Sequence, residues 1–286
     1  MTTVQLYNEV YDINTTILCS NINNITAISP KIKCFHNLEI LILSNNKIIH
    51  ICPEIQYLHK LKTLNLSYNR ITYVCSKIQY LHNLEKLYLN SNNITLICSK
   101  IWRLQNLYEL YLNNNQIIHQ PQTQQPQQIY YLRNFQILNL SNNKIFLSTN
   151  IYPSTNIYLK ILNNLYELYL TYNQITQIPA EIRYLKNLRI FDVNYNQITT
   201  IPMEIKYLKH LNIFNLSVNL LTQIPVEIQY LHNLNIFDIS CNQISFTDTL
   251  QNIIVQCNNL KKFEFYGNKI ERLGTNFQHF MNKMNE

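Results

Sequence analysis

The sequence predicts an α/β solenoid, a curved horseshoe with a parallel sheet on its concave face and short helical or irregular turns on its convex face. A 23-residue unit, seen clearly in residues 188–210, recurs along most of the chain. Each copy begins with the apolar alternation of a short strand and then places an Asn at the same position. Units that recur at such a period stack on their neighbours and bury one continuous core.

The strand of each unit is indicated by alternation of apolar and variable residues. Alternate side chains of a strand point to opposite faces. Leu64 and Leu66 are therefore expected to point into the core, and Thr63 and Asn65 to point outward.

The recurring Asn predicts a turn and an internal amide ladder. A short amide side chain tolerates tight turns and bonds nearby backbone groups. We expect the loss of one interior Asn to cost about 1–3 kcal/mol, the usual cost of leaving a buried polar group unpaired. The residues at this position are Asn23, Asn46, Asn69, Asn92, Asn115, Asn143, Asn173, Asn196, Asn219, Asn242 and Asn268.

The second half of the unit predicts a short helical turn, because Ile178, Ile182 and Leu185 are three to four residues apart. Paired strands lie about 4.8 Å apart. Bulkier outer turns cannot approach that closely, so the stack is expected to curve with its strands on the inside.

The unit boundaries predict three segments. An N-terminal cap covers residues 1–14, a solenoid of about eleven repeats covers 15–273, and a C-terminal cap covers 274–286. Two units are longer, 107–134 and 135–164, and carry insertions at 119–128 and 148–156. These insertions are either tolerated loops or binding loops beside the arc.

The pattern L-x-x-[LF]-x-[LVIF]-x-x-N-x-[IL] begins each clear copy. It resembles the signature of the leucine-rich-repeat family over residues 15–273. The second half of the unit, as in 178–188, is similar to the intracellular Ras-suppressor-like subclass of 23-residue repeats. The resemblance implies a scaffold for small GTPases, kinases or phosphatases.

Composition indicates an intracellular, cytoplasmic protein. The N-terminus lacks the features of a signal peptide, and no apolar stretch is long enough to cross a membrane. Seven cysteines, an odd number without clustered spacing, favour a reducing compartment.

The sequence shows no constellation typical of catalysis, a metal or a cofactor. Cys52, Cys75 and Cys98 recur every 23 residues and are interpreted as small buried apolar residues. The recurring histidines also follow the repeat, without a carboxylate companion. Only two glycines occur, which excludes a glycine-rich phosphate loop. We therefore predict no enzyme, no cofactor and no metal site.

The outward strand positions are the candidate site, because they line up across the repeats. The third, fifth, seventh and eighth positions carry five acidic and two basic side chains, a net charge of −3, whereas the whole chain is +7. Tyrosine, apolar and acidic residues together favour a protein partner over nucleic acid. The candidate residues are Tyr68, Tyr88, Glu109, Tyr111, Glu167, Tyr169, Tyr172, Asp192, Tyr195, Asp238 and Glu264.

The predicted function is a non-catalytic protein-interaction module or scaffold that binds a protein partner on its concave face. Two alternatives remain open at this point. One is a substrate-recognition adaptor of a ubiquitin ligase, or a host-directed effector. The other is nucleic-acid binding through the basic outer side, which carries the remaining charge of +10.

Overall fold

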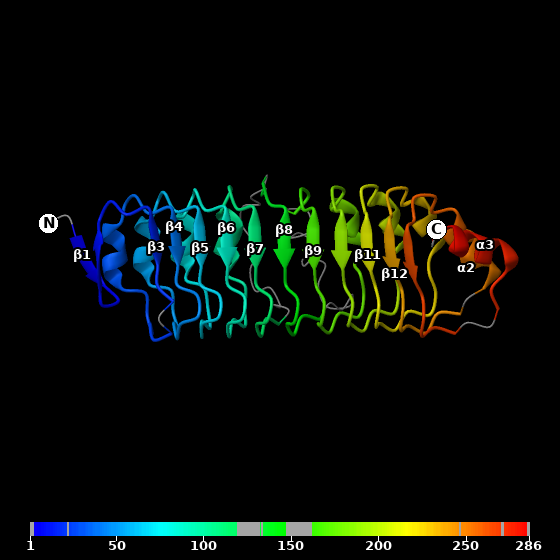
Figure 1. The fold of residues 1–286 in the computed structure, drawn as a ribbon, viewed down its shortest axis with the longest axis horizontal. Helices are drawn as coiled ribbons and strands as arrows, with labels where there is room; N and C mark the ends of the chain where they lie inside the picture. The colour runs from blue at the N-terminus through cyan, green and yellow to red at the C-terminus, as the bar shows by residue number, and fades with distance from the viewer. Residues whose placement is uncertain are drawn as a thin grey trace. The chain divides into compact units, whose positions relative to one another are not determined.

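The computed structural model describes residues 3–21, 23–118, 132, 134–146, 162–245, 247–269 and 272–284. The chain divides into two compact units, Met1–Lys144 (unit 1) and Ile145–Glu286 (unit 2). The insertions predicted at 119–128 and 148–156 lie outside the described residues. Within each unit, parallel strands lie side by side and the connecting segments return to the start of the next strand (Figure 1).

Unit 1 contains an antiparallel hairpin followed by six parallel strands that pair in chain order. Four of the connections carry a 3₁₀ helix of five residues. The strands are β1 (Thr3–Leu6), β2 (Glu9–Asp12), β3 (Ile17–Cys19), β4 (Ile40–Ile42), β5 (Thr63–Asn65), β6 (Lys86–Tyr88), β7 (Glu109–Tyr111) and β8 (Ile137–Asn139), and the 3₁₀ helices are η1 (Pro30–Cys34), η2 (Pro53–Tyr57), η3 (Ser76–Tyr80) and η4 (Ser99–Arg103).

Unit 2 continues the same pattern with five parallel strands, again paired in chain order. Its last repeat carries an α-helix in place of the 3₁₀ helix, and a second α-helix follows the last strand. The elements are β9 (Glu167–Tyr169), η5 (Ala180–Tyr184), β10 (Ile190–Asp192), η6 (Met203–Tyr207), β11 (Ile213–Asn215), η7 (Val226–Tyr230), β12 (Ile236–Asp238), α2 (Asp248–Val255), β13 (Lys262–Glu264) and α3 (Thr275–Met284).

The strand residues alternate between core and surface as the sequence predicts. Leu64 is fully buried at the middle of β5, and its neighbours Thr63 and Asn65 are half-buried on the other face. The parallel pairing has no offset, so each middle residue lies beside the middle residue of the next strand. From β10 to β13 this column is aromatic: the rings of Phe191, Phe214, Phe237 and Phe263 stack with neighbouring centroids 5.4–5.7 Å apart.

The predicted helical turns are present as 3₁₀ helices. In η2, Ile55 is buried, and the N–H of Leu58 donates to the carbonyl of Ile55. The helix stops after five residues, in keeping with 3₁₀ structure being used in short pieces. The repeat that holds α2 is longer than 23 residues, and Leu250 and Ile254 on that helix enter the core.

The predicted amide ladder is confirmed and has a direction. The Asn69 Oδ1 accepts from the Ile48 N–H at 2.9 Å, and its Nδ2 donates to the carbonyl oxygens of Leu43 at 2.9 Å and Leu66 at 3.1 Å. Ile48 and Leu43 belong to the preceding repeat, whereas Leu66 belongs to its own. The same arrangement recurs from Asn46 to Asn268, with these side chains mostly buried.

The first predicted member of the ladder, Asn23, departs from this arrangement. Asn23 is exposed, with a φ of 61°. Each ladder Asn bonds to the repeat before it, and Asn23 belongs to the first repeat. The prediction of a buried amide was therefore wrong for Asn23, because no earlier repeat supplies the carbonyl that it would need.

The residue just before each ladder Asn adopts a left-handed backbone conformation, which the sequence did not indicate. A positive φ is uncommon for residues other than Gly, Asn and Asp. This position is held by Asn114 and Gly267 in two repeats, but by Tyr172, Tyr195 and Val218 in three others, with φ of 52°, 50° and 54°. The turn geometry is therefore imposed by the repeat and not by the local residue.

Both ends of the described chain pack against neighbouring repeats. The Tyr7 hydroxyl, between β1 and β2, accepts from the Ser29 N–H at 3.3 Å. At the other end, Phe277 of α3 is buried edge-on against Phe263 and Phe265. We propose that these segments cap the terminal repeats, as a repeat without a neighbour requires.

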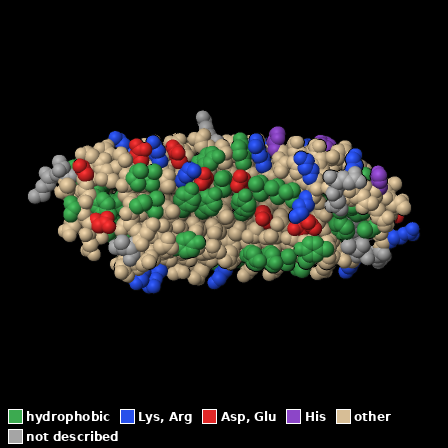
Figure 2. Space-filling model, viewed as in Figure 1, with side chains coloured by type: hydrophobic (Ala, Val, Ile, Leu, Met, Phe, Trp, Pro, Cys, Tyr) green, Lys and Arg blue, Asp and Glu red, His purple; other side chains and the backbone are tan. Residues whose placement is uncertain are grey.

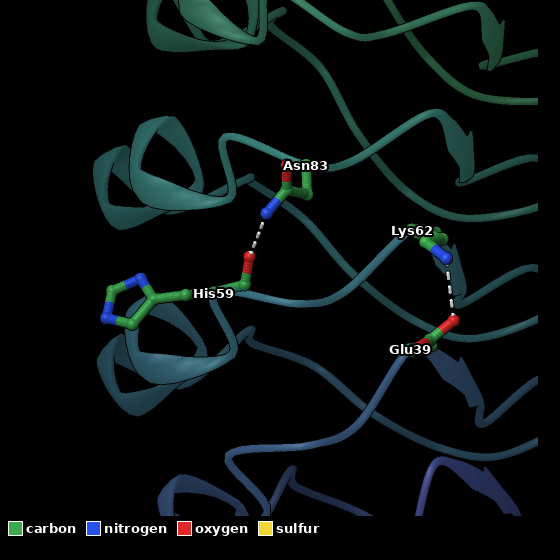
Figure 3. A network of polar contacts seen from close by, with 4 residues as sticks. All are labelled: Glu39, His59, Lys62 and Asn83. Atoms are coloured by element: carbon green, nitrogen blue, oxygen red, sulfur yellow. Dashed lines mark hydrogen bonds and ion pairs between the residues drawn. The ribbon is translucent and has the colours of Figure 1, made fainter.

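Polar contacts outside the core also join adjacent repeats (Figure 3). Lys62 pairs with Glu39 at 2.8 Å, and the Asn83 Nδ2 donates to the His59 carbonyl at 2.7 Å. Both ends of each contact are largely exposed. Exposed ion pairs stabilise proteins by roughly 0–1 kcal/mol, so the buried amides contribute more to the stack.

Replacing Asn69 by Ala is expected to lower the free energy of unfolding by about 1–3 kcal/mol, because the buried Ile48 N–H loses its acceptor and three carbonyl oxygens each lose one of their donors. Chemical denaturation monitored by circular dichroism measures the change. The control is Asn93→Ala, at an exposed position in the same turn region, which should stay within about 0.5 kcal/mol of the parent chain. Equal effects of the two changes would contradict the ladder's role.

Candidate functional site

The side chains at the third, fifth, seventh and eighth positions of each repeat define the strand face. The third and fifth positions flank the buried middle residue of each strand, as Thr63 and Asn65 do in β5. On the side that carries the strands, hydrophobic side chains gather in groups with carboxylates and cations among them (Figure 2). Eight of the sequence-predicted candidate residues lie on strands, whereas Tyr68, Tyr172 and Tyr195 lie in the turns that follow strands.

Three of the four candidates of unit 1, Tyr88, Glu109 and Tyr111, form one compact cluster on β6 and β7. The rings of Tyr88 and Tyr111 stack with centroids 5.2 Å apart. The Tyr88 hydroxyl donates to Glu109 at 2.9 Å, and Lys86 pairs with the same carboxylate at 2.9 Å. Burial raises the pKa of Tyr88 to about 12, with the Glu109 hydrogen bond adding to the rise.

Glu109 therefore serves to hold the cluster together more than to contact a partner. It is only 9% exposed, and Lys86 already balances its charge. The pair joins the neighbouring third positions of β6 and β7, which hold opposite charges on adjacent strands. The tyrosine stack above it is the part of the cluster that remains half-exposed.

Unit 2 holds two further tyrosine groups. The Tyr169 hydroxyl donates to Glu167 at 2.9 Å within β9. At the turn positions, the rings of Tyr172 and Tyr195 stack with centroids 4.1 Å apart and an angle of 15° between their planes. These two side chains are 52% and 43% exposed, respectively. The pair is therefore a flat aromatic surface open to solvent.

Three carboxylates of unit 2 occupy the fifth position of their repeats. Asp192 on β10, Asn215 on β11 and Asp238 on β12 are direct neighbours in the sheet, and Glu264 on β13 comes next. Burial raises the pKa of the Asp192 carboxyl above its ordinary value, and the charge of Asp238 adds to the rise. A hydrogen bond from the Asn194 N–H, at 3.3 Å, acts in the opposite direction.

Two surface tyrosines stand apart from these groups. Tyr68 is 56% exposed and lies in unit 1 between Asn45 and Ser91, its neighbours at the left-handed turn position. Tyr266, just after β13, is also exposed and was not among the predicted residues. Tyr266 occupies the seventh position of its repeat, which is Asn, Ser or Thr in the other repeats of unit 2. The repeat pattern therefore gave no reason to select it.

The recurring cysteines are free and half-buried. Cys52 and Cys75 precede η2 and η3 as extended N-cap residues. Burial raises the pKa of the Cys52 thiol to about 11 and also raises that of Cys75. A thiol with a raised pKa is a poor nucleophile at neutral pH. Among the described residues, no three His, Cys, Asp or Glu side chains are close enough together to hold a metal ion.

Among the described residues, no helix is both long enough and apolar enough to cross a membrane.

Comparison with known proteins identifies the repeat. A family model described as leucine rich repeat matches residues 36–94, 60–117 and 163–221. The chain is similar to a leucine-rich-repeat protein of Leptospira interrogans, at 25% identity over 91% of this chain and 79% of that one, with a TM-score of 0.57. No curated protein sequence matches the chain.

Two receptor structures are also similar. A TDR receptor shares 25% identity over 91% of this chain and 44% of its own, with a TM-score of 0.76. The plant peptide hormone receptor RGFR1, solved in complex with RGF2, shares 23% identity over 94% of this chain and 53% of its own, with a TM-score of 0.51. The chain therefore spans about half of the length of these receptor chains.

Replacing Asp192 by Asn is expected to stabilise the chain at pH 7. Because the folded-state pKa is raised above the ordinary value of 3.8, the ionised carboxylate costs folding free energy at neutral pH. That cost disappears as the pH falls through the raised pKa towards 3.8. Thermal unfolding should therefore show a gain from Asp192→Asn at pH 7 that shrinks in acid.

The control for this prediction is Glu85→Gln, the same chemical change at an exposed carboxylate. It should shift the unfolding temperature little at either pH. A destabilised Asp192→Asn chain at pH 7 would contradict the argument from burial.

Proposed function

Because the chain belongs to the leucine-rich-repeat family, we propose that it is a non-catalytic module that binds a protein partner on its strand face. Leucine-rich repeats generally serve as interaction modules. The repeat uses its Leu, Ile, Phe and ladder Asn residues to build the core, which leaves the third, fifth, seventh and eighth positions to recognise a partner.

The stacked, exposed pair of Tyr172 and Tyr195 is the observation that carries the proposal. Both residues hold the left-handed turn conformation, which a Tyr adopts at a cost. Their rings nevertheless lie 4.1 Å apart and remain open to solvent. Tyrosine supplies a large rigid surface with a polar tip, and it is enriched at the energetic centres of protein interfaces.

The charge of the strand face supports a protein partner over nucleic acid. Its four stripes carry five acidic and two basic side chains, although the chain as a whole is +7. Nucleic-acid binding requires cations that neutralise phosphates, and this face presents the opposite sign. The similarity to RGFR1, which is solved in complex with RGF2, supports the same choice.

The finer details of the proposal rest on the sequence. The Pro-x-Glu-Ile-x-Tyr-Leu segments at 202–208 and 225–231 favour the Ras-suppressor-like subclass, whose partners include small GTPases, kinases and phosphatases. The free cysteines favour a reducing compartment such as the cytoplasm.

Replacing Tyr172 and Tyr195 together by Ala is expected to weaken partner binding by about 30-fold or more, as the loss of a hot spot of roughly 2 kcal/mol does. The test is affinity capture from the native host with the tagged parent chain, followed by binding measurements on the captured protein. Thermal unfolding of the double variant should remain close to that of the parent, because both rings are largely exposed.

The matched control is a double change of Tyr207 and Tyr230 to Ala. These residues are 46% and 43% exposed, but they end η6 and η7 and lie away from the strand face. Their loss should leave binding unchanged. If the partner bound the Tyr172/Tyr195 variant as tightly as the parent and was lost with the outer pair, the binding face would be the other one.

A further inference from the structure

Two parallel stripes of different chemistry cross the strands of unit 2. The third positions of β10, β11 and β12 hold Ile190, Ile213 and Ile236, which are half-buried direct neighbours in the sheet. This is the isoleucine stripe. The fifth positions of β9 to β13 form the acidic stripe, which consists of Tyr169, Asp192, Asn215, Asp238 and Glu264.

The net charge of this surface is strongly negative. The third and fifth positions of β9 to β13 hold four carboxylates, with Glu167 as the fourth, and one cation, Lys262. The Lys262 Nζ forms an ion pair with the Glu264 Oε1 at 3.3 Å. An apolar stripe bordered by excess negative charge is complementary to a segment with apolar side chains flanked by cations.

Asp192 and Asp238 remain without a cation among the described residues. Asp192 accepts from the Asn194 N–H, and Asp238 accepts from the Ser240 N–H at 2.9 Å and the Ser240 hydroxyl at 2.6 Å. These donors are neutral. The ion pairs within 4.0 Å that the described residues make do not include either aspartate.

The stripe spacing favours a helix over an extended strand as the partner. Neighbouring strands lie about 4.8 Å apart, so Asp192 and Asp238, two strands apart, are separated by about 9.6 Å. A helix laid across the strands repeats every 5.4 Å, so its i and i+7 side chains lie about 10.5 Å apart. An extended segment repeats on one face every 6.6–6.8 Å or so, and falls out of step after one strand.

We propose that the strand face of unit 2 binds a basic amphipathic helix of a protein partner, which lies across β9 to β13. Its apolar side chains pack on the isoleucine stripe, and its Lys or Arg side chains pair with Asp192 and Asp238. The proposal rests on the proposed function, because it names the kind of partner segment that the same face accepts. Long basic side chains accommodate the small mismatch between the helix repeat and the strand spacing.

The test uses synthetic peptides of about four helical turns, the length that crosses five strands. The first has Leu on one face, Lys beside that face, and Ala and Gln elsewhere. The second replaces Lys by Glu. The third replaces two central Ala by Pro, which breaks the helix. Fluorescence anisotropy with the full chain should show binding of the first peptide, and at least tenfold weaker binding of the other two.

The protein variant is the double change Asp192→Asn and Asp238→Asn. It keeps the local fold, because Asn215 already makes the same turn contacts at the fifth position, accepting from the Ser217 N–H at 3.0 Å and the Ser217 hydroxyl at 2.8 Å. Binding of the Lys peptide should fall by about tenfold. The matched control is Glu204→Gln with Glu227→Gln, on η6 and η7, which should not change binding.

The outcomes separate this inference from the proposed function. If the Pro peptide bound as tightly as the Lys peptide, the proposal that the partner segment is helical would be wrong. If the Glu peptide bound as tightly as the Lys peptide, or if the aspartate variant bound the Lys peptide as tightly as the parent chain, the proposed charge pairing would be wrong. If none of the peptides bound while the captured host protein still required Tyr172 and Tyr195, the inference would fail and the proposed function would stand. If none of the peptides bound and the captured host protein also did not require Tyr172 and Tyr195, both the inference and the proposed function would be wrong.

Discussion

The amide ladder is the interaction on which the rest of the structure depends. Each ladder Asn, such as Asn69, accepts from one backbone N–H of the preceding repeat and donates to carbonyls of both repeats. These contacts hold adjacent repeats in one register, so that the same position of each repeat lies beside its equivalents. The isoleucine and acidic stripes of unit 2 exist only because this register is kept. A binding surface made of short strands is thus assembled by residues that do not themselves contact a partner.

The surface also carries side chains that folding alone would not favour. The left-handed turn position is held by Tyr172, Tyr195 and the β-branched Val218, although Asn or Gly adopts that conformation at lower cost. Asp192 is half-buried, none of the described cations forms an ion pair with it, and burial raises the pKa of its carboxyl. Such costs are common where a surface is selected for binding and not for stability.

The repeat architecture was predictable from the sequence because the same physical pattern recurs with each copy. The alternation around Leu64, the turn at Asn69 and the spacing of Ile178 and Ile182 each specify local structure, and the structure confirms all three. The candidate residues were selected by position, because the same variable position recurs in each repeat. Features that depend on particular neighbours were harder to predict. The exposure of Asn23 follows from the direction of the ladder, and the pairing of Glu109 with Lys86 follows from a comparison of two adjacent strands. The partner's identity is not encoded by the repeat at all, because the repeat fixes only the positions that build the core.

The central claim is that core positions hold the stack together while the strand-face positions bind a protein. Hydrogen exchange with and without the captured partner tests it most directly, because backbone protection reports which segments a partner covers. The account predicts added protection in the strands and following turns of unit 2, at 167–173, 190–196 and 213–219, with little change in η5, η6 and η7. Protection confined to those 3₁₀ helices, with the strands unchanged, would contradict it.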